Sequence, residues 1–84
     1  MSQTNQDSVV ARFEKNARDE VWVSVSEYQG KPLINFRVHY KDKDGEWRPG
    51  KQGLAFGVDK YRDLAHAVIE LGKRLQEDGL IPKQ

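Results

Sequence analysis

The 84-residue sequence contains no cysteine, which excludes a disulfide framework and any thiolate metal site. Its two histidines, His39 and His66, are too few for a metal cluster, and no cofactor is predicted. No apolar run approaches the roughly 18 residues that a membrane-spanning helix requires. The N-terminal stretch MSQTNQDSVV lacks the basic start and apolar core of a signal peptide. These absences predict a soluble protein of a reducing, intracellular compartment.

A catalytic constellation is also lacking. Ser24 and Ser26 have no base near them in the sequence, and His66 falls in a predicted helix. The glycines of GKQG, residues 50–53, lack the spacing of a phosphate-binding P-loop and do not open a helix. The sequence therefore predicts that the protein is not an enzyme.

The formal net charge of +1 conceals an uneven distribution along the chain. Residues 1–27 carry three basic and five acidic groups, residues 28–52 carry six and three, and residues 53–84 carry five of each. Only the middle third is cationic. A local basic stretch of this kind favours an anionic partner.

Period-two alternation of side chains predicts strands in the first two thirds of the chain. A short strand is expected at residues 9–13, and a clearer one at Val21–Tyr28, where valines alternate with small or aromatic residues. Gln29 and Gly30 predict a tight hairpin turn into a strand at residues 32–41. The alternation of that strand places Ile34, Phe36, Val38 and Tyr40 on one side and Leu33, Asn35, Arg37, His39 and Lys41 on the other.

The fourth predicted strand, Glu46–Phe56, follows an Asp-Gly turn at residues 42–45. It is unusual because Pro49 lacks a backbone donor and because Gly50 and Gly53 weaken strand pairing. We therefore expect a bend or bulge there, at an edge or a corner of the sheet.

From Val58 onward the apolar residues follow the period of a helix. They recur at spacings of three and four, at Tyr61, Leu64, Val68, Leu71 and Leu75. Gly57 or Asp59 is expected to cap the start of the helix, and Gly79 lies in the usual position after its end. The expected fold is α+β, with four antiparallel strands followed by one helix that covers one face of the sheet.

The chain is predicted to hold one domain, residues 9–84, after a disordered polar tail at residues 1–8. A chain of this length is close to the size at which a single core is only marginally sufficient, so a dimer is favoured. The helix face made by Leu64, Val68, Leu71 and Leu75 is expected to cover the sheet and is also a candidate dimer interface.

Aromatic and cationic residues are interleaved across the predicted hairpins, at Tyr28, Lys31, Phe36, Arg37, Tyr40, Trp47, Arg48 and Lys51. Single-stranded nucleic acid is held by this combination, since cations follow the phosphates and rings stack on bases, at roughly 1–3 kcal/mol per base. The alternative is that aromatics are simply common in strands and cations common on exposed faces. Phe36 is assigned to the core because it shares a side with Ile34 and Val38. Alternation also places Arg37 and Tyr40 on opposite faces unless a bulge intervenes.

The run VSVSEYQGKPLINFRVHYKDKDGEWRPGKQGLAF, residues 23–56, resembles the DNA-binding domain of the positive cofactor four family of transcriptional coactivators, including its small bacterial members. The features that match are VSV, the pair EY before GK, an LI strand with an arginine four residues on, and GEWRPGKQGL. The predicted helix matches the family in position and length.

This resemblance implies a symmetric homodimer, each subunit a curved four-stranded antiparallel sheet followed by a helix. It implies non-enzymatic binding of single-stranded or melted DNA with little sequence preference, in transcription regulation, replication or repair. Carried over position by position, Tyr28 and Tyr40 resemble the base-stacking aromatics. The residues that resemble the phosphate-contacting cations are Lys31, Arg37, Arg48 and Lys51. Trp47 completes the predicted DNA-binding set, and RPGKQG resembles the family's bent strand.

Departures from the family predict weaker binding. Ser26, Gln29 and Gln52 stand where better-known eukaryotic members have basic side chains, and Tyr40 stands in place of a tryptophan. Two alternatives stay open: binding of single-stranded or structured RNA, and a protein-interaction module whose basic face docks an acidic partner such as a component of the transcription machinery. If the source is bacterial, the expected location is the cytoplasm, in association with the nucleoid, with no membrane partner.

Overall fold

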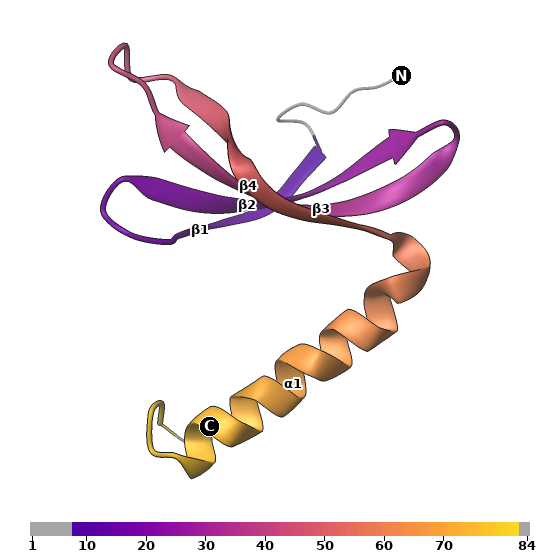
Figure 1. Cartoon of the computed structure of the whole chain (residues 1–84), viewed down its shortest axis with the longest axis vertical. Coiled ribbons are helices and arrows are strands. Elements are labelled where there is room, and N and C mark those ends of the chain that lie inside the picture. Colours follow the sequence, from indigo (N-terminus) through magenta and orange to yellow (C-terminus); the bar gives the residue numbers. More distant parts are fainter. Residues whose placement is uncertain (1–7, 83–84) are drawn as a thin grey trace.

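A computed structural model describes residues 8–82, which form one antiparallel sheet followed by a helix (Figure 1). The strands, which lie in the sheet in chain order, are β1 (Val9–Glu14), β2 (Asp19–Tyr28), β3 (Lys31–Lys41) and β4 (Trp47–Gly57). A 3₁₀ turn, η2 (Val58–Lys60), leads into the helix α1 (Tyr61–Glu77). The predicted α+β fold and its four strands are confirmed. The predicted polar tail lies outside the described residues except for Ser8.

The two predicted hairpin turns have the backbone that their sequences require. Gln29 and Gly30 both lie in the left-handed region, at φ values of 53° and 79°, and close the turn between β2 and β3. Gly45, at φ 82°, serves the turn between β3 and β4. In that turn the Asp42 carboxylate accepts hydrogen bonds from the backbone N–H groups of Asp44 and Glu46, at 2.9 and 3.0 Å.

The register between β2 and β3 is unbroken and gives the sheet two chemically distinct faces. Side chains paired across strands share a face. The apolar face carries Ala11, Phe13, Val21, Val23, Val25, Ile34, Phe36, Val38, Leu54 and Phe56. The polar face carries Arg12, Glu20, Trp22, Ser24, Ser26, Tyr28, Lys31, Asn35, Arg37, His39, Lys41 and Trp47. Arg37 pairs with Trp22 and Tyr40 with Asp19, so Arg37 and Tyr40 lie on opposite faces, as predicted.

The edge strand β4 contains the predicted irregularity, because its register against β3 shifts between the pairs made by Arg37 and His39. The strands approach so closely here that a Cβ added at Gly53 would lie 2.8 Å from the Phe36 carbonyl oxygen. A Cβ at Gly50 would lie 3.0 Å from the carbonyl oxygen of Val38. These two glycines therefore allow a contact between backbones that a larger residue would push apart.

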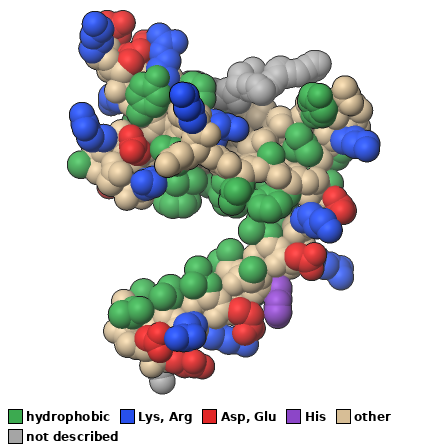
Figure 2. Space-filling view, in the orientation of Figure 1, with side chains coloured by type: hydrophobic (Ala, Val, Ile, Leu, Met, Phe, Trp, Pro, Cys, Tyr) green, Lys and Arg blue, Asp and Glu red, His purple; other side chains and the backbone are tan. Residues whose placement is uncertain are grey.

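The helix α1 does not cover the sheet, so that prediction is wrong. Within the described chain it packs on neither face, and η2 directs it away from β4 (Figure 1). Val68 and Leu71 are 57% and 56% exposed. Figure 2 shows hydrophobic side chains on the side of the helix that faces the sheet and on the nearest side of the sheet. Periodicity predicted an apolar stripe correctly, but it does not determine which surface the stripe contacts.

Both ends of the helical segment can be compared with the sequence. Gly57 occupies the N-cap position of η2, where the helical segment begins at Val58, as one of the two predicted alternatives has it. Asp59 caps neither element, since no side chain caps η2 or α1 in the described structure, and Lys60 is the N-cap residue of α1. At the other end, Gly79 has a φ of 71° and donates its N–H to the Gln76 carbonyl, as predicted. Residues 8–82 include no helix that is long and apolar enough to cross a membrane.

Candidate nucleic-acid interface

Tyr28 and Lys31 form the first aromatic and cationic pair, on either side of the turn between β2 and β3. They face each other across the strands on the polar face. Tyr28 is 64% exposed, and Lys31 is also exposed. A ring that is this accessible beside an ammonium group has the geometry needed to stack on a base and to contact the adjoining phosphate.

Tyr40 and Arg48 form a second pair of the same kind, between β3 and β4. Tyr40 is 45% exposed. The Arg48 Nε donates to the Asp42 Oδ2 at 2.7 Å. This bond from Arg48, followed by the backbone N–H of Glu46, lowers the pKa of Asp42, and the same ion pair raises the pKa of Arg48. A phosphate that binds Arg48 must therefore compete with Asp42.

The bulge in β4 positions Arg37. This half-buried side chain donates from Nη1 to the Gly50 carbonyl at 3.1 Å. It lies opposite Gly53, where an added Cβ would come within 3.1 Å of the Arg37 Cζ. Lys51 is exposed in the same segment. The glycines of the bent strand thus leave the room in which the guanidinium of Arg37 lies.

The sequence prediction missed a compact cluster around Trp22, which at 5% exposure is the only buried residue in the described part of the chain. Its ring stacks on His39, with centroids 4.0 Å apart and planes at 7°. The Arg12 guanidinium lies 4.3 Å from the Trp22 ring centroid. The Trp47 ring lies 6.1 Å from that of Trp22, tilted by 57°. Alternation places Trp22 and His39 on one side of their strands, but the contribution of Arg12 from β1 requires the three-dimensional pairing.

Glu20 holds this cluster together. Its Oε1 accepts hydrogen bonds from Arg12 Nε and Trp22 Nε1, both at 2.9 Å. Partial burial acts to raise the pKa of Glu20, but these two hydrogen bonds and the positive charges of Arg12 and Lys41 outweigh it, and the pKa is lowered. The pKa of His39 is lowered, chiefly by burial and also by the charges of Arg37 and Arg12, although the hydrogen bond with the Arg37 carbonyl acts to raise it. At neutral pH the cluster therefore contains a carboxylate and a neutral imidazole.

The predicted site residues do not form one continuous surface on a single chain. Lys31 and Tyr40 are nine residues apart on β3, a distance of roughly 30 Å along an extended strand. The pair with Tyr28 lies on the polar face, whereas the pair with Arg48 shares the opposite face near the other end of β3. The structure thus creates two separate aromatic and cationic pairs, with Arg37 between them along the strand.

The sequence and the fold both have known counterparts. The profile of the family described as Transcriptional Coactivator p15 (PC4) matches residues 15–67. The chain is also similar to the RNA polymerase II transcriptional coactivator KIWI of Arabidopsis thaliana, with 36% identity over 76 residues. The alignment covers 90% of this chain and 66% of that relative, so this chain spans slightly less than two thirds of the relative's length.

Solved structures with the same fold support this similarity. A PC4 homolog from Burkholderia pseudomallei has a TM-score of 0.71 and 21% identity, covering 82% of this chain and 96% of that one. The protein in a MoSub1-DNA complex has a TM-score of 0.63 and 26% identity, covering 98% of this chain and 100% of that one.

Proposed function

This chain belongs to the Transcriptional Coactivator p15 (PC4) family, and from that premise we propose that it binds single-stranded or melted DNA as a homodimer. The binding has little sequence preference and serves transcription regulation, replication or repair. The role is one of binding without catalysis. Two similar proteins support this proposal. One is a transcriptional coactivator, and the other was solved as a complex with DNA.

The observation that carries the proposal is the pairing of exposed tyrosines with cations across strands. Tyr28 with Lys31 and Tyr40 with Arg48 each place a ring beside a positive charge. A base can stack on the ring while its phosphate contacts the cation, and neither contact depends on which base is present. Arg37 and Lys51 extend the phosphate-binding set between the two pairs, and Trp47 adds a third ring.

We further propose that a second copy of the chain covers the apolar surfaces that one copy leaves open. Only Trp22 is buried among residues 8–82, while Leu54 on the sheet and Leu71 on the helix are 62% and 56% exposed. Exposed apolar surface on both elements supports this proposal, because such surface marks sites of protein association. If folding and dimerisation are coupled, the melting temperature rises with protein concentration. A melting temperature that is independent of concentration, with a monomer mass in sedimentation, would contradict the dimer.

The test of DNA binding is fluorescence anisotropy of a labelled mixed-sequence oligonucleotide, single-stranded and duplex, at two or more salt concentrations. We expect the single strand to bind more tightly and its affinity to fall with salt. Four phosphate-contacting cations per chain predict a log-log slope of roughly −3 for each chain that is engaged. An absence of binding at low salt would overturn the proposal.

The same assay distinguishes the alternatives. Competition with an RNA oligonucleotide of the same sequence tests for RNA binding, because stacking and phosphate contacts do not by themselves exclude a 2′-hydroxyl group. If RNA competes more strongly than DNA, the proposal of a DNA-binding protein is wrong. For a bacterial source, the expected association with the nucleoid is tested by locating a fluorescent fusion in the cell.

A further inference from the structure

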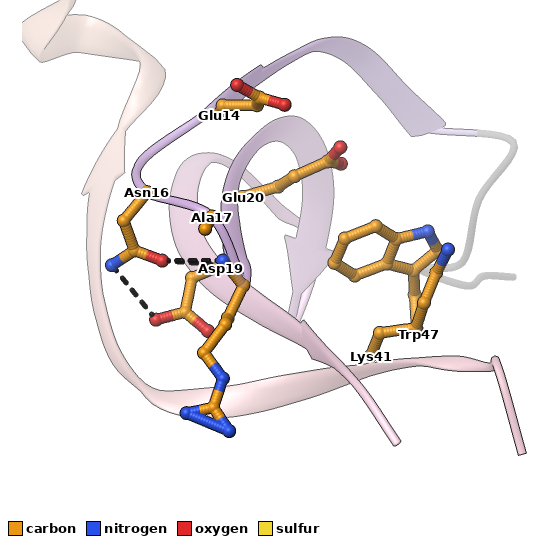
Figure 3. Close-up of a pocket in the computed structure, with 8 residues that line it drawn as sticks. Glu14, Asn16, Ala17, Asp19, Glu20, Lys41 and Trp47 are labelled. Atoms are coloured by element: carbon orange, nitrogen blue, oxygen red, sulfur yellow. Dashed lines mark hydrogen bonds between the residues drawn. The ribbon is translucent and has the colours of Figure 1, made fainter. Parts of the chain in front are cut away.

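A pocket with a volume of about 430 Å³ lies between the turn that joins β1 to β2 and the start of β4 (Figure 3). Figure 3 shows Trp47 and Lys41 along one side of it and Asn16 and Asp19 along the other, with Glu14 and Glu20 also in its lining. Its volume is within the range of pockets that bind small molecules, roughly 300–1,000 Å³. None of the contacts proposed above for DNA, apart from that of Trp47, uses this pocket.

The lining combines three kinds of group. Trp47 offers an aromatic surface, the carboxylates of Glu14, Asp19 and Glu20 accept hydrogen bonds only, and Lys41 and Arg18 supply positive charge. The two cations would repel a cationic ligand, and the three carboxylates would repel a simple anion. A nucleotide matches all three groups, since it has a flat ring, a hydrogen-bonding edge and a phosphate.

Neighbouring side chains pack against the aromatic wall of the pocket. Trp47 is half-buried against Trp22, and the Arg12 guanidinium lies 5.5 Å from the Trp47 ring centroid. The Lys41 Nζ lies 5.2 Å from the same centroid. Lys41 is exposed and has a flexible stem, so a base stacked on Trp47 can displace its ammonium group towards the attached phosphate.

The three carboxylates differ in how many hydrogen bonds they already accept. Glu20 accepts from Arg12 and Trp22 through Oε1, and Asp19 accepts from Asn16 Nδ2 at 3.4 Å. Glu14 makes no hydrogen bond or ion pair with any other described residue. Within residues 8–82 both of its oxygens are therefore available to a pair of adjacent donors on a ligand.

From this arrangement we propose that the pocket binds a guanine base of the single strand, stacked on Trp47 and read by the Glu14 carboxylate. Guanine alone among the DNA bases presents two adjacent donors, N1–H and N2–H, to which a carboxylate can bind in a bidentate manner. Thymine offers one N–H between two carbonyl oxygens, which the carboxylate repels. Adenine and cytosine each place a ring acceptor beside their amino group. The pocket thus adds a local base preference to the binding proposed above, on which this inference rests.

The test compares short oligothymidines that carry one central guanine, adenine, cytosine or hypoxanthine in the anisotropy assay. The guanine oligonucleotide is expected to bind the full-length protein at least about fivefold more tightly than the others, as one bidentate base contact provides. Hypoxanthine keeps N1–H but lacks the N2 amino group, so it should lose most of the preference. Equal affinities for all four oligonucleotides would overturn the pocket and leave the proposed DNA binding intact.

Glu14→Gln tests the residue that reads the base, and Glu27→Gln is its matched control. Glu27 is an exposed carboxylate at the other end of β2, and each variant removes one negative charge. Both variants should bind plain oligothymidine slightly more tightly because repulsion of phosphate falls. Only Glu14→Gln should lose the preference for guanine. If the preference survives Glu14→Gln, or if Glu27→Gln also removes it, the assignment to Glu14 is wrong.

A second measurement examines the pocket without relying on DNA binding. The chain has two tryptophans, so a nitrogen-15 spectrum shows two indole N–H signals, which a Trp47→Phe variant assigns. Deoxyguanosine monophosphate should shift the Trp47 signal, and thymidine monophosphate should not. A shift in a protein that fails to bind oligothymidine would support the pocket and contradict the proposed DNA binding. No shift, or equal shifts with both nucleotides, would contradict the pocket.

Discussion

Asp42 holds Arg48 in an ion pair at 2.7 Å while its other oxygen accepts two backbone N–H groups of the turn. One carboxylate therefore shapes the hairpin and restrains a cation that is proposed to contact phosphate. These two roles use different oxygens, so they can be separated by substitution.

Asp42→Asn is expected to keep the turn, because the amide oxygen can still accept the N–H groups of Asp44 and Glu46. It removes the charge that competes for Arg48, so the affinity for single-stranded DNA should rise about threefold or more at low salt, and less at high salt. Asp44→Asn is the matched control, since Asp44 lies in the same turn and has no ion pair with another described residue. Equal gains for the two variants would mean that only the overall charge matters.

The two exposed tyrosines are expected to contribute through their rings. Tyr28→Ala and Tyr40→Ala should each weaken binding of single-stranded DNA by about 1–3 kcal/mol, the range for one stacked base. Tyr28 is 64% exposed, so Tyr28→Ala should leave the melting temperature nearly unchanged. Tyr28→Phe and Tyr40→Phe retain a ring and should retain most of the affinity. Full affinity in the alanine variants would show that the rings do not stack on bases, and unfolding of those variants would assign the rings a structural role.

His39 predicts how stability depends on pH. Its pKa in the folded protein is lowered from an ordinary value of 6.5, chiefly by burial and also by the charges of Arg37 and Arg12, although the hydrogen bond with the Arg37 carbonyl acts to raise it. The folded state thus favours the neutral imidazole, and this contribution is complete above pH 6.5 and declines as the pH falls through and below that value. Urea denaturation should show lower stability below pH 6 than at pH 7.5. His39→Phe keeps a ring against Trp22 and should make stability less dependent on pH in this range. If the pH dependence is unchanged in this variant, another group is responsible for it.

The sequence predicted what is local in this fold. Alternation identified the faces of β2 and β3, because the register between them contains no bulge. Gln29 and Gly30 identified their turn, because a two-residue loop requires left-handed backbone. Alternation also separated Arg37 from Tyr40 correctly.

Relationships between distant residues could not be predicted in this way. The contact of Arg12 with Trp22 depends on the pairing of β1 with β2, and no local pattern encodes it. Asp42 was interpreted as a turn residue only, although it also binds Arg48 six residues later. The apolar stripe of α1 was predicted, but its position relative to the sheet depends on the path that η2 takes.

Gly53 is expected to matter both for stability and for the position of Arg37. In Gly53→Ala the new Cβ would lie 2.8 Å from the Phe36 carbonyl oxygen and 3.1 Å from the Arg37 Cζ. Because the first neighbour is backbone, β3 and β4 must move apart, and overpacking of this kind typically costs about 1–3 kcal/mol. Thermal denaturation measures that loss of stability.

The Arg37 guanidinium beside the Gly50 carbonyl must also shift in this variant, because its Cζ would lie 3.1 Å from the new Cβ, so binding of single-stranded DNA should weaken. Gln52→Ala is the matched control, since it alters the neighbouring exposed side chain and adds no atom between the strands. One outcome is that Gly53→Ala lowers the melting temperature and leaves the affinity of the folded protein and its salt dependence unchanged. In that case the bulge is needed for the fold alone. A loss of affinity together with a shallower salt slope shows that the bent strand holds Arg37 where it contacts phosphate.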